Sequence, residues 1–262
     1  MTDPTLASDL DFALQLADSA DAISRERFRA NDLVVTMKPD MTHVTDADKA
    51  VETAIRARVA ASRPADSIYG EEYGTVGESR RQWIIDPIDG TANYLRGVPV
   101  WATLIALAVD GVPMLGVVSA PALGRRWWGA NGLGAFTREL DGAEHGIRVS
   151  QVADLEHASI ACSGLDRFEE AGRLTQYLDL MRATWRNRDY GDAWPYMMVA
   201  EGLVDVAGEF GLQPYDMAAL FPIVQEAGGT FTSMDGEAGP WHGSALATNG
   251  RLHEAVRTTL SR

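Results

Sequence analysis

The sequence predicts a mixed α/β fold in two halves, an N-terminal half on an antiparallel sheet and a C-terminal α/β half. Two apolar runs, 101–109 and 112–120, are joined by Asp110-Gly111, a dipeptide typical of tight hairpins. Helical periodicity precedes this hairpin. Strand-like and helix-like runs alternate in the last part of the chain, as they do in layered α/β proteins. We place the halves at residues 1–145 and 146–262.

The N-terminal half opens with an amphipathic helix whose small and apolar residues recur at helical spacing. We expect helices over 4–29 and from about 45 to 61, and strands at 33–35, 67–69, 83–85, 101–109, 112–120, 125–130 and 134–137. Trp127 and Trp128 are neighbours on a strand, so they point to opposite faces, and we expect one packed inside and one partly covered. The polar stretch 141–146 is interpreted as a loop between the halves.

The C-terminal half alternates between short apolar runs and longer helical ones. We expect strands at 159–162, 184–188, 203–207, 229–232 and 245–247, and helices at 168–183, 192–202, 215–227 and 251–260. Gly228-Gly229 is a typical C-terminal stop for the third of these helices.

Composition limits the possible partners. The chain has 262 residues and a formal net charge of −14, which argues against nucleic acid or an anionic membrane as a partner. No window of about 18 apolar residues exists, and the polar N-terminus does not resemble a signal peptide. The single cysteine, Cys162, follows an apolar run and is expected in the core, which fits a reducing, cytoplasmic setting. The five histidines show no zinc-binding spacing.

The stretch from Trp83 to Asn93 carries the strongest chemical signal. An apolar strand delivers Asp86 and Asp89 to a turn stiffened by Pro87, and Gly90-Thr91 then enters a short helix. Carboxylate oxygens suit a hard divalent cation, and the free N–H groups of a helix start suit a phosphate. The pattern favours metal-assisted chemistry on a phosphate ester. A turn with two solvated acids is the alternative.

Further acids lie at comparable strand–helix junctions. Glu71 and Glu72 follow a short strand between glycines, and Asp216 begins a helix. Each has an ordinary alternative, a solvated turn or an acid that favours the helix dipole. Thr45 and Asp48 have the spacing of a capping box, which is the structural alternative for both.

Taken together, these motifs resemble the inositol monophosphatase family. The resemblance rests on Gly70-Glu71-Glu72, on Asp86-Pro87-Ile88-Asp89-Gly90-Thr91 and on Asp216-Met217-Ala218-Ala219, and it runs from about residue 5 to 260. It implies a layered αβαβα fold and a Mg²⁺-dependent, lithium-sensitive phosphatase acting on a small phosphate monoester. It also implies two or three metal ions per site and a homodimer.

The resemblance carries over to individual residues. The implied metal ligands are Glu71, Asp86, Asp89, Asp216 and the carbonyl of Ile88. Gly90 and Thr91 would present N–H groups to the phosphate, and Thr91 would orient the attacking water, with Glu71 as its base. The family's V-T-x-x-D pattern matches Thr45 and Asp48, which assist at the metals. Lys38 and the loop to His43 would form a mobile flap.

Residues at the alcohol end of the substrate are less uniform in the family. Glu209 and Asp192 would both face that end, beside Asp216, and two carboxylates suit a cationic alcohol because an ammonium compensates their charge. Arg188 could reach the substrate or a neighbouring subunit, or pair with Asp189. Asp192 could instead be a plain helix cap.

The strings 38–48 and 188–192 are similar to the histidinol-phosphatase branch, so we expect histidinol phosphate as the substrate. The family's Trp-Asp is Tyr215-Asp216 here, and the aspartate it places before Val-Thr is absent. The alternatives are an inositol monophosphatase or broad sugar-phosphate phosphatase, a 3′-phosphoadenosine 5′-phosphate phosphatase, and a non-catalytic scaffold. Magnesium-dependent release of phosphate would exclude the scaffold.

Overall fold

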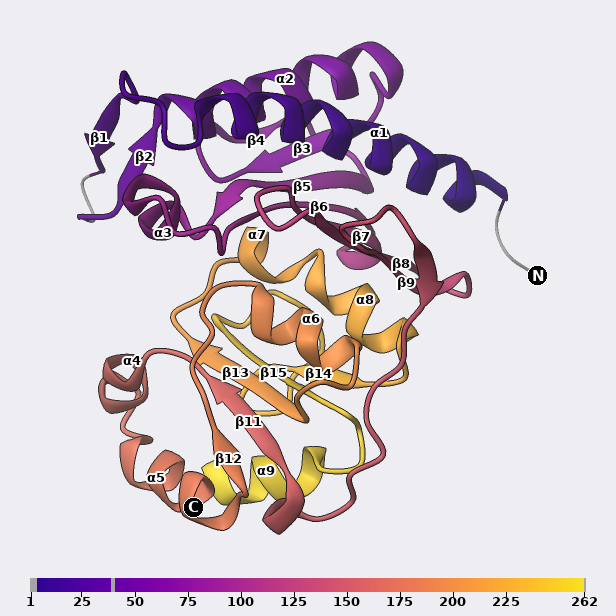
Figure 1. Ribbon diagram of the computed structural model, residues 1–262. Helices are drawn as coiled ribbons and strands as arrows, with labels where there is room; N and C mark the ends of the chain where they lie inside the picture. Colours follow the sequence, from indigo (N-terminus) through magenta and orange to yellow (C-terminus); the bar gives the residue numbers. More distant parts are fainter. Residues whose placement is uncertain (1–3, 39–40, 262) are drawn as a thin grey trace.

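The computed structural model describes residues 4–38 and 41–261 and contains two large β-sheets with helices above, between and below them (Figure 1). Helices α1 (Pro4–Arg27) and α2 (Asp46–Ser62) cover the outer face of an eight-stranded sheet. Helices α6 (Trp194–Ala200), α7 (Pro214–Met217) and α8 (Leu220–Glu226) separate this sheet from a five-stranded one. Helices α4 (Leu165–Glu170), α5 (Leu174–Ala183) and α9 (His253–Leu260) lie on its far side. The expected αβαβα layering is confirmed.

The larger sheet belongs to the N-terminal half and is antiparallel apart from one pair. Its strand order is β10-β9-β8-β7-β6-β5-β3-β4, and only β3 and β5 are parallel. Its strands are β3 (Ser67–Gly70), β4 (Gly74–Val76), β5 (Arg81–Asp89), β6 (Ala102–Val109), β7 (Val112–Ala120), β8 (Arg125–Ala130), β9 (Gly134–Arg138) and β10 (Glu144–Gly146). A separate hairpin is formed by β1 (Val35–Met37) and β2 (His43–Thr45), and the short helix α3 (Thr91–Arg96) follows β5.

The smaller sheet belongs to the C-terminal half and has the order β12-β11-β13-β15-β14. Its strands are β11 (Ser159–Cys162), β12 (Arg186–Asn187), β13 (Val206–Phe210), β14 (Thr230–Thr232) and β15 (Ser244–Thr248), and a 3₁₀ turn, η1 (Leu155–His157), precedes β11. The first three strands in the order run parallel, whereas β15 is antiparallel to both β13 and β14.

Two of the predicted helices are interrupted, each for a local backbone reason. The helix expected over 168–183 is split into α4 and α5, because Gly172 between them adopts a left-handed φ of +69°. The helix expected over 215–227 is split into α7 and α8. Pro222 lacks the N–H that would bond to the carbonyl of Ala218, so the helix restarts instead of continuing.

Three smaller expectations are also corrected. The strands expected at 33–35 and 203–207 lie two to three residues further along the chain, at β1 and β13. The stretch 141–146 is not only a loop, because β10 within it pairs with β9. Trp127 and Trp128 do lie on opposite faces of β8, but both are buried, one in the core between the sheets and one in the core beneath α1 and α2. Cys162 is buried in the core, as expected.

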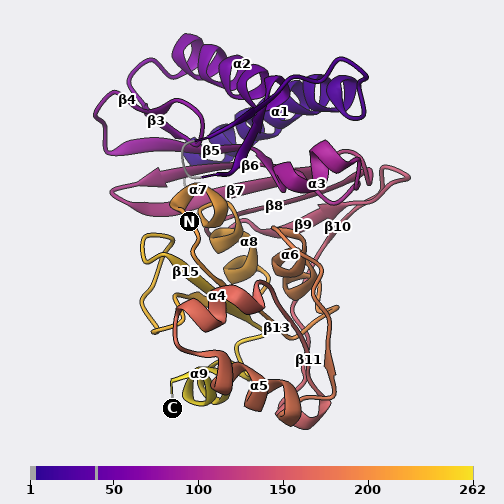
Figure 2. The ribbon, with the colours of Figure 1, turned by 90° about the vertical axis from the view of Figure 1, so that its left-hand side faces the viewer.

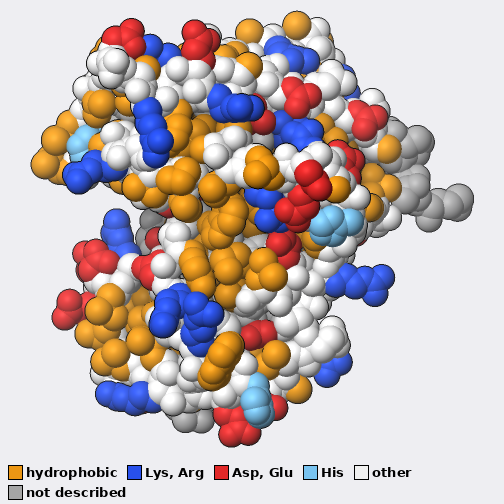
Figure 3. All heavy atoms as spheres, viewed as in Figure 1, with side chains coloured by type: hydrophobic (Ala, Val, Ile, Leu, Met, Phe, Trp, Pro, Cys, Tyr) orange, Lys and Arg blue, Asp and Glu red, His pale blue; other side chains and the backbone are white. Residues whose placement is uncertain are grey.

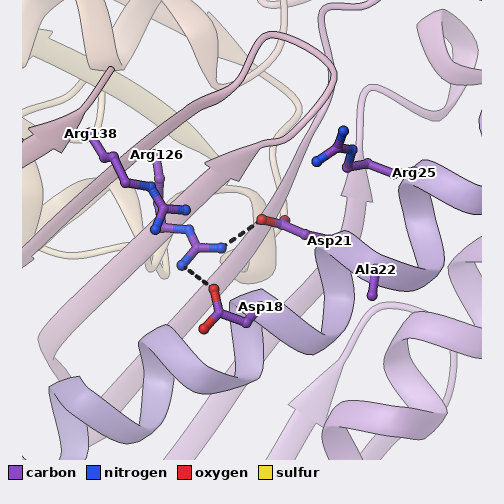
Figure 4. A pocket seen from close by; sticks show the side chains of 6 residues that line it. All are labelled: Asp18, Asp21, Ala22, Arg25, Arg126 and Arg138. Atoms are coloured by element: carbon purple, nitrogen blue, oxygen red, sulfur yellow. Dashed lines mark hydrogen bonds and ion pairs between the residues drawn. The ribbon is translucent and has the colours of Figure 1, made fainter. Parts of the chain in front are cut away.

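Helix α1 is fixed to the large sheet by ion pairs of the buried Arg126, beside a hollow of about 490 Å³ (Figure 4). Arg126 of β8 is 2% exposed and donates to Asp18 Oδ1 at 2.8 Å and to Asp21 Oδ2 at 2.6 Å. Asp21 also accepts from Ser119 Oγ of β7 at 2.9 Å. The charge of the guanidinium is therefore compensated by the two aspartates, and these bonds attach α1 to β7 and β8. Across the described ranges 4–38 and 41–261, the search for a helix able to cross a membrane finds none.

Candidate active site

A cleft of about 770 Å³ lies where the two halves meet, and its lining includes five acidic side chains together with the cations Lys38 and Arg167. The N-terminal half contributes residues from the end of β5 and the start of α3, and the C-terminal half contributes α6, α7 and the end of β13. Figure 2 shows α7 seated against the large sheet, and α7 packs on β5. The expected site residues that line the cleft are Glu71, Asp89, Gly90, Thr91, Asp192, Glu209 and Asp216.

Three of the expected metal ligands converge. Carboxylate oxygens of Asp86, Asp89 and Asp216 all lie within 4.8 Å of one another. The pairing of β5 with β6 is irregular between Asp86 and Asp89, and the intervening carbonyl of Pro87 accepts from Thr103 Oγ1 at 2.8 Å. Burial raises the pKa of both Asp86 and Asp89 well above the usual range, with added repulsion from Glu71 at Asp86 and from Asp192 at Asp89. Burial raises the pKa of Asp216 to about 6.

Glu71 belongs to a second acidic cluster, with Asp48 and Glu72. Lys38 joins the two glutamates, with its Nζ 2.8 Å from Glu71 Oε1 and 2.7 Å from Glu72 Oε1. Burial, with repulsion from Glu72 and Asp216, raises the pKa of Glu71 to about 7 although Lys38 opposes it. The four expected acids thus form two adjoining groups, and the ammonium of Lys38 compensates the second.

A divalent cation fits this donor set. Asp86 is 2% exposed, and its Oδ1 atom has no hydrogen-bond partner within the described ranges. A buried, unpaired carboxylate oxygen beside two further carboxylates is costly unless a cation compensates it. All the donors are oxygens, which Mg²⁺ prefers to nitrogen or sulfur. Asp86, Asp89, Asp216 and Glu71 are therefore suited to hold Mg²⁺, and their pKa directions describe the protein without it.

Thr91 connects the acids to the start of α3. Its Oγ1 lies 3.2 Å from Asp48 Oδ1 and 3.0 Å from the carbonyl of Ile88. Thr45 and Asp48 form the capping box of α2, with Thr45 N 2.8 Å from Asp48 Oδ2. The capping role and a role in the site are compatible, because the other oxygen of Asp48 faces Thr91.

Gly90 makes the sharp turn into α3 possible. Its φ of +84° is left-handed, and a Cβ on it would lie 3.0 Å from Asp192 Oδ2. Helix α3 begins at the next residue, so the N–H groups of Gly90 and Thr91 lie among the unsatisfied donors of a helix start.

Asp192 is not a plain helix cap. Helix α6 begins two residues later, and Asp192 itself has a left-handed φ of +54°. Its Oδ2 accepts from Asn93 Nδ2 of α3 at 2.7 Å, across the junction between the halves. The next N–H, of Ala193, donates to Asp89 Oδ2 at 2.6 Å. The segment before α6 is therefore tied to the metal-ligand strand.

Glu209, on β13, lines the same cleft. Burial and repulsion from Asp192 and Asp216 raise its pKa to about 8. Arg188 is not among the residues that line the cleft, and its Nη1 donates to the carbonyl of Asn187 at 2.6 Å. Asp189 accepts from Ser163 Oγ and from Gly191 N, so the sequence alternative of an Arg188–Asp189 pair has no support in these contacts.

Sequence reasoning gave no role in the site to Glu72 or Tyr196, nor to Arg167, which also lines the cleft. Glu72 turns its side chain inward to Lys38, and its place beside Glu71 was the available signal. Tyr196 of α6 lines the cleft, is 3% exposed, and has a buried hydroxyl with no partner in the described part of the chain. No sequence pattern distinguished it from a core tyrosine. Of the expected flap, Lys38, Thr42 and His43 line the cleft, whereas Pro39 and Asp40 lie outside the described residues.

Comparison with known proteins agrees with this architecture. The model of the inositol monophosphatase family matches residues 6–262. A histidinol-phosphatase from Streptomyces coelicolor is 56% identical over 257 residues, 97% of each chain. A histidinol-phosphatase from Mycobacterium tuberculosis is 53% identical over 255 residues, 97% of this chain and 98% of the relative.

Solved structures give the same result. An inositol monophosphatase from Zymomonas mobilis superposes with a TM-score of 0.85 at 30% identity, covering 99% of this chain and 100% of that one. An inositol monophosphatase from Anabaena has a TM-score of 0.83 at 30% identity, with 98% and 96% coverage. The family match, the near-complete coverage and the shared fold lead to one conclusion: this chain belongs to the inositol monophosphatase family.

Proposed function

We propose that this protein is a Mg²⁺-dependent phosphatase that hydrolyses histidinol phosphate to histidinol. The observation that carries the proposal is the convergence of Asp86, Asp89 and Asp216 beside the start of α3, in a cleft that also holds Glu209. The two relatives above 50% identity are named histidinol-phosphatases, which supports the choice of substrate.

Asp86, Asp89 and Asp216 would hold Mg²⁺ on one side of the phosphate, and the start of α3 would bind the phosphate on the other. When bound, Mg²⁺ polarises phosphoryl oxygens and lowers the pKa of a coordinated water. The N–H groups of Gly90 and Thr91 would bind the non-bridging oxygens. The Thr91 hydroxyl, held between Asp48 and the Ile88 carbonyl, would orient the attacking water. Glu71 would take a proton from that water at its carboxylate.

The alcohol end of the substrate would meet Glu209 and Asp192. A neutral polyol would leave these neighbouring carboxylates uncompensated, whereas an ammonium or imidazolium would pair with them. Burial is the main cause of the raised pKa of Glu209, about 8, and repulsion from Asp192 and Asp216 adds to it although Arg167 opposes it. Asp216 contributes to the same wall. Arg188 would act on the substrate only if its segment moved toward the cleft or a second subunit supplied it.

We extend the proposal to the assembly and its setting. Two or three Mg²⁺ ions per site, inhibition by lithium, a homodimer and a cytoplasmic location are proposed from the family resemblance. Hydrophobic side chains gather over the middle of the face seen in Figure 3, which supports a contact between subunits there. The halves 1–145 and 146–262 are proposed as domains, with most metal ligands in the first and Asp216 and the specificity residues in the second.

Phosphate release after metal removal tests this proposal. The protein is treated with a chelator, dialysed and assayed on histidinol phosphate with and without added Mg²⁺. We expect no turnover without the metal and full recovery with it. Turnover that is unaffected by chelation, or none at any Mg²⁺ concentration, would contradict the proposal.

A further inference from the structure

Helix α2 carries a fully buried carboxylate, Glu52, that the proposed chemistry does not use. Glu52 is 0% exposed. Its Oε2 accepts from the backbone N–H of Glu72 at 2.7 Å, and its Oε1 accepts from the N–H of Tyr73 at 3.2 Å. Glu52 therefore reaches from α2 into the turn that follows β3, where Glu71 begins.

A second residue of α2 completes this contact. Arg56, one turn after Glu52, donates from Nε to Glu52 Oε1 at 2.7 Å, and its Nη2 donates to the carbonyl of Gly74. Gly70 and Gly74 pair at the two ends of the turn, so residues 71–73 form the loop of the β3–β4 hairpin. Glu52 thus accepts from two N–H groups of the three-residue loop, and Arg56 donates to the carbonyl of Gly74, which ends the loop.

The sequence is adapted to this approach at Gly70. A Cβ on Gly70 would lie 2.0 Å from Glu52 Oε1 and 2.4 Å from its Cδ, so a side chain there would expel the carboxylate. Beyond Gly70, the N–H of Glu71 donates to the carbonyl of Ile85 at 3.1 Å, which ties the loop to the strand that bears Asp86. These bonds attach the loop to α2 on one side and to β5 on the other. The backbone positions of Glu71 and Glu72, which carry the two carboxylates, are therefore fixed.

We infer that Glu52 and Arg56 are positioning residues that hold the Glu71–Glu72 loop in the geometry needed to bind the cation. The inference rests on the proposed metal site and deepens it. Glu52 touches neither substrate nor metal; it acts through the loop backbone. Groups that orient metal ligands in this way typically change metal affinity by roughly 10- to 100-fold when they are removed.

The test is the variant Glu52→Gln, which keeps the shape and loses the charge. We expect the Mg²⁺ concentration for half-maximal activity to rise at least about tenfold, with kcat at saturating Mg²⁺ nearly unchanged. The rise in melting temperature caused by Mg²⁺ should need a correspondingly higher concentration, which measures binding without turnover.

The matched control is Asp205→Asn in the C-terminal half. Asp205 is also a buried carboxylate, 5% exposed, and accepts from the backbone N–H of Ser159 at 2.7 Å. Its loss should lower the melting temperature without changing the Mg²⁺ requirement. If Glu52→Gln does not fold, Arg56→Lys decides, because lysine keeps the charge but lacks the planar guanidinium whose Nε and Nη2 bond separately to Glu52 and Gly74.

An unchanged Mg²⁺ requirement in Glu52→Gln, or in Arg56→Lys if Glu52→Gln does not fold, would overturn the inference. Failure of the proposed function gives a different result, because the wild-type protein would then show neither Mg²⁺-dependent turnover nor a shift in melting temperature with Mg²⁺.

Discussion

Glu209→Gln should remove one defined contribution to the pH dependence of stability in the metal-free protein. The pKa of Glu209 is about 8, against a usual value of 4.5, because burial and the neighbouring carboxylates Asp192 and Asp216 disfavour its ionised form. The folded state therefore holds the proton more tightly than the unfolded state. The stabilisation that the protonated Glu209 contributes is fully present below pH 4.5 and is lost as the pH rises to about 8.

The size of this loss follows from the two pKa values. They differ by about 3.5, and each pKa unit corresponds to about 1.4 kcal/mol, so the loss reaches at most about 5 kcal/mol above pH 8. A glutamine at 209 has no proton to lose. The free energy of unfolding of the variant, relative to wild type, should therefore increase by several kcal/mol between pH 5 and pH 9.

Urea unfolding in the presence of a chelator measures the free energy of unfolding of the variant and of the wild type at pH 5 and at pH 9. Glu156→Gln is the control, because Glu156 has a side chain 79% exposed on the surface, outside the cleft, and its replacement should change stability by a similar small amount at both. A difference between Glu209→Gln and wild type that is the same at pH 5 and pH 9 would refute the electrostatic reasoning.

Three predictions concern activity. Asp89→Asn should abolish turnover while the fold is kept, because it removes a ligand charge and relieves repulsion in the metal-free site; near-normal phosphate release would contradict the metal assignment. Thr91→Val should lower kcat about 100-fold with little change in KM, since the hydroxyl between Asp48 and Ile88 is lost; steady-state kinetics would show an unchanged kcat if the hydroxyl has no part in positioning water. Glu209→Gln should weaken binding of histidinol phosphate more than that of inositol 1-phosphate, and equal losses would disprove a pocket that recognises a cation.

Local signals in the sequence were sufficient for much of the fold. Asp110 and Gly111 have φ values of +51° and +79°, which suit the tight turn that the dipeptide predicted between β6 and β7. The strand–turn–helix expected from Trp83 to Asn93 is present as β5 and α3. Such features depend on neighbouring residues, so a single sequence can indicate them.

Contacts between segments far apart in the sequence were harder to predict. The bonds of Lys38 to Glu71 and Glu72, and of Asp192 to Asn93, join residues 33 to 99 positions apart. Glu52 looks like an ordinary charged helix residue until the loop at Glu72 is placed above it. Helix breaks at Gly172 and Pro222 were hidden within otherwise continuous helical periodicity. The metal ligands were assigned by resemblance to a family, whereas spacing alone left a solvated turn as an alternative.

The most direct test of the proposed function is phosphate release with Mg²⁺ from histidinol phosphate, inositol 1-phosphate and 3′-phosphoadenosine 5′-phosphate, measured side by side. We predict a preference for histidinol phosphate of at least roughly 100-fold in kcat/KM, equivalent to about 2.7 kcal/mol of transition-state discrimination. A preference for inositol 1-phosphate would contradict recognition of a cationic alcohol by Glu209 and Asp192.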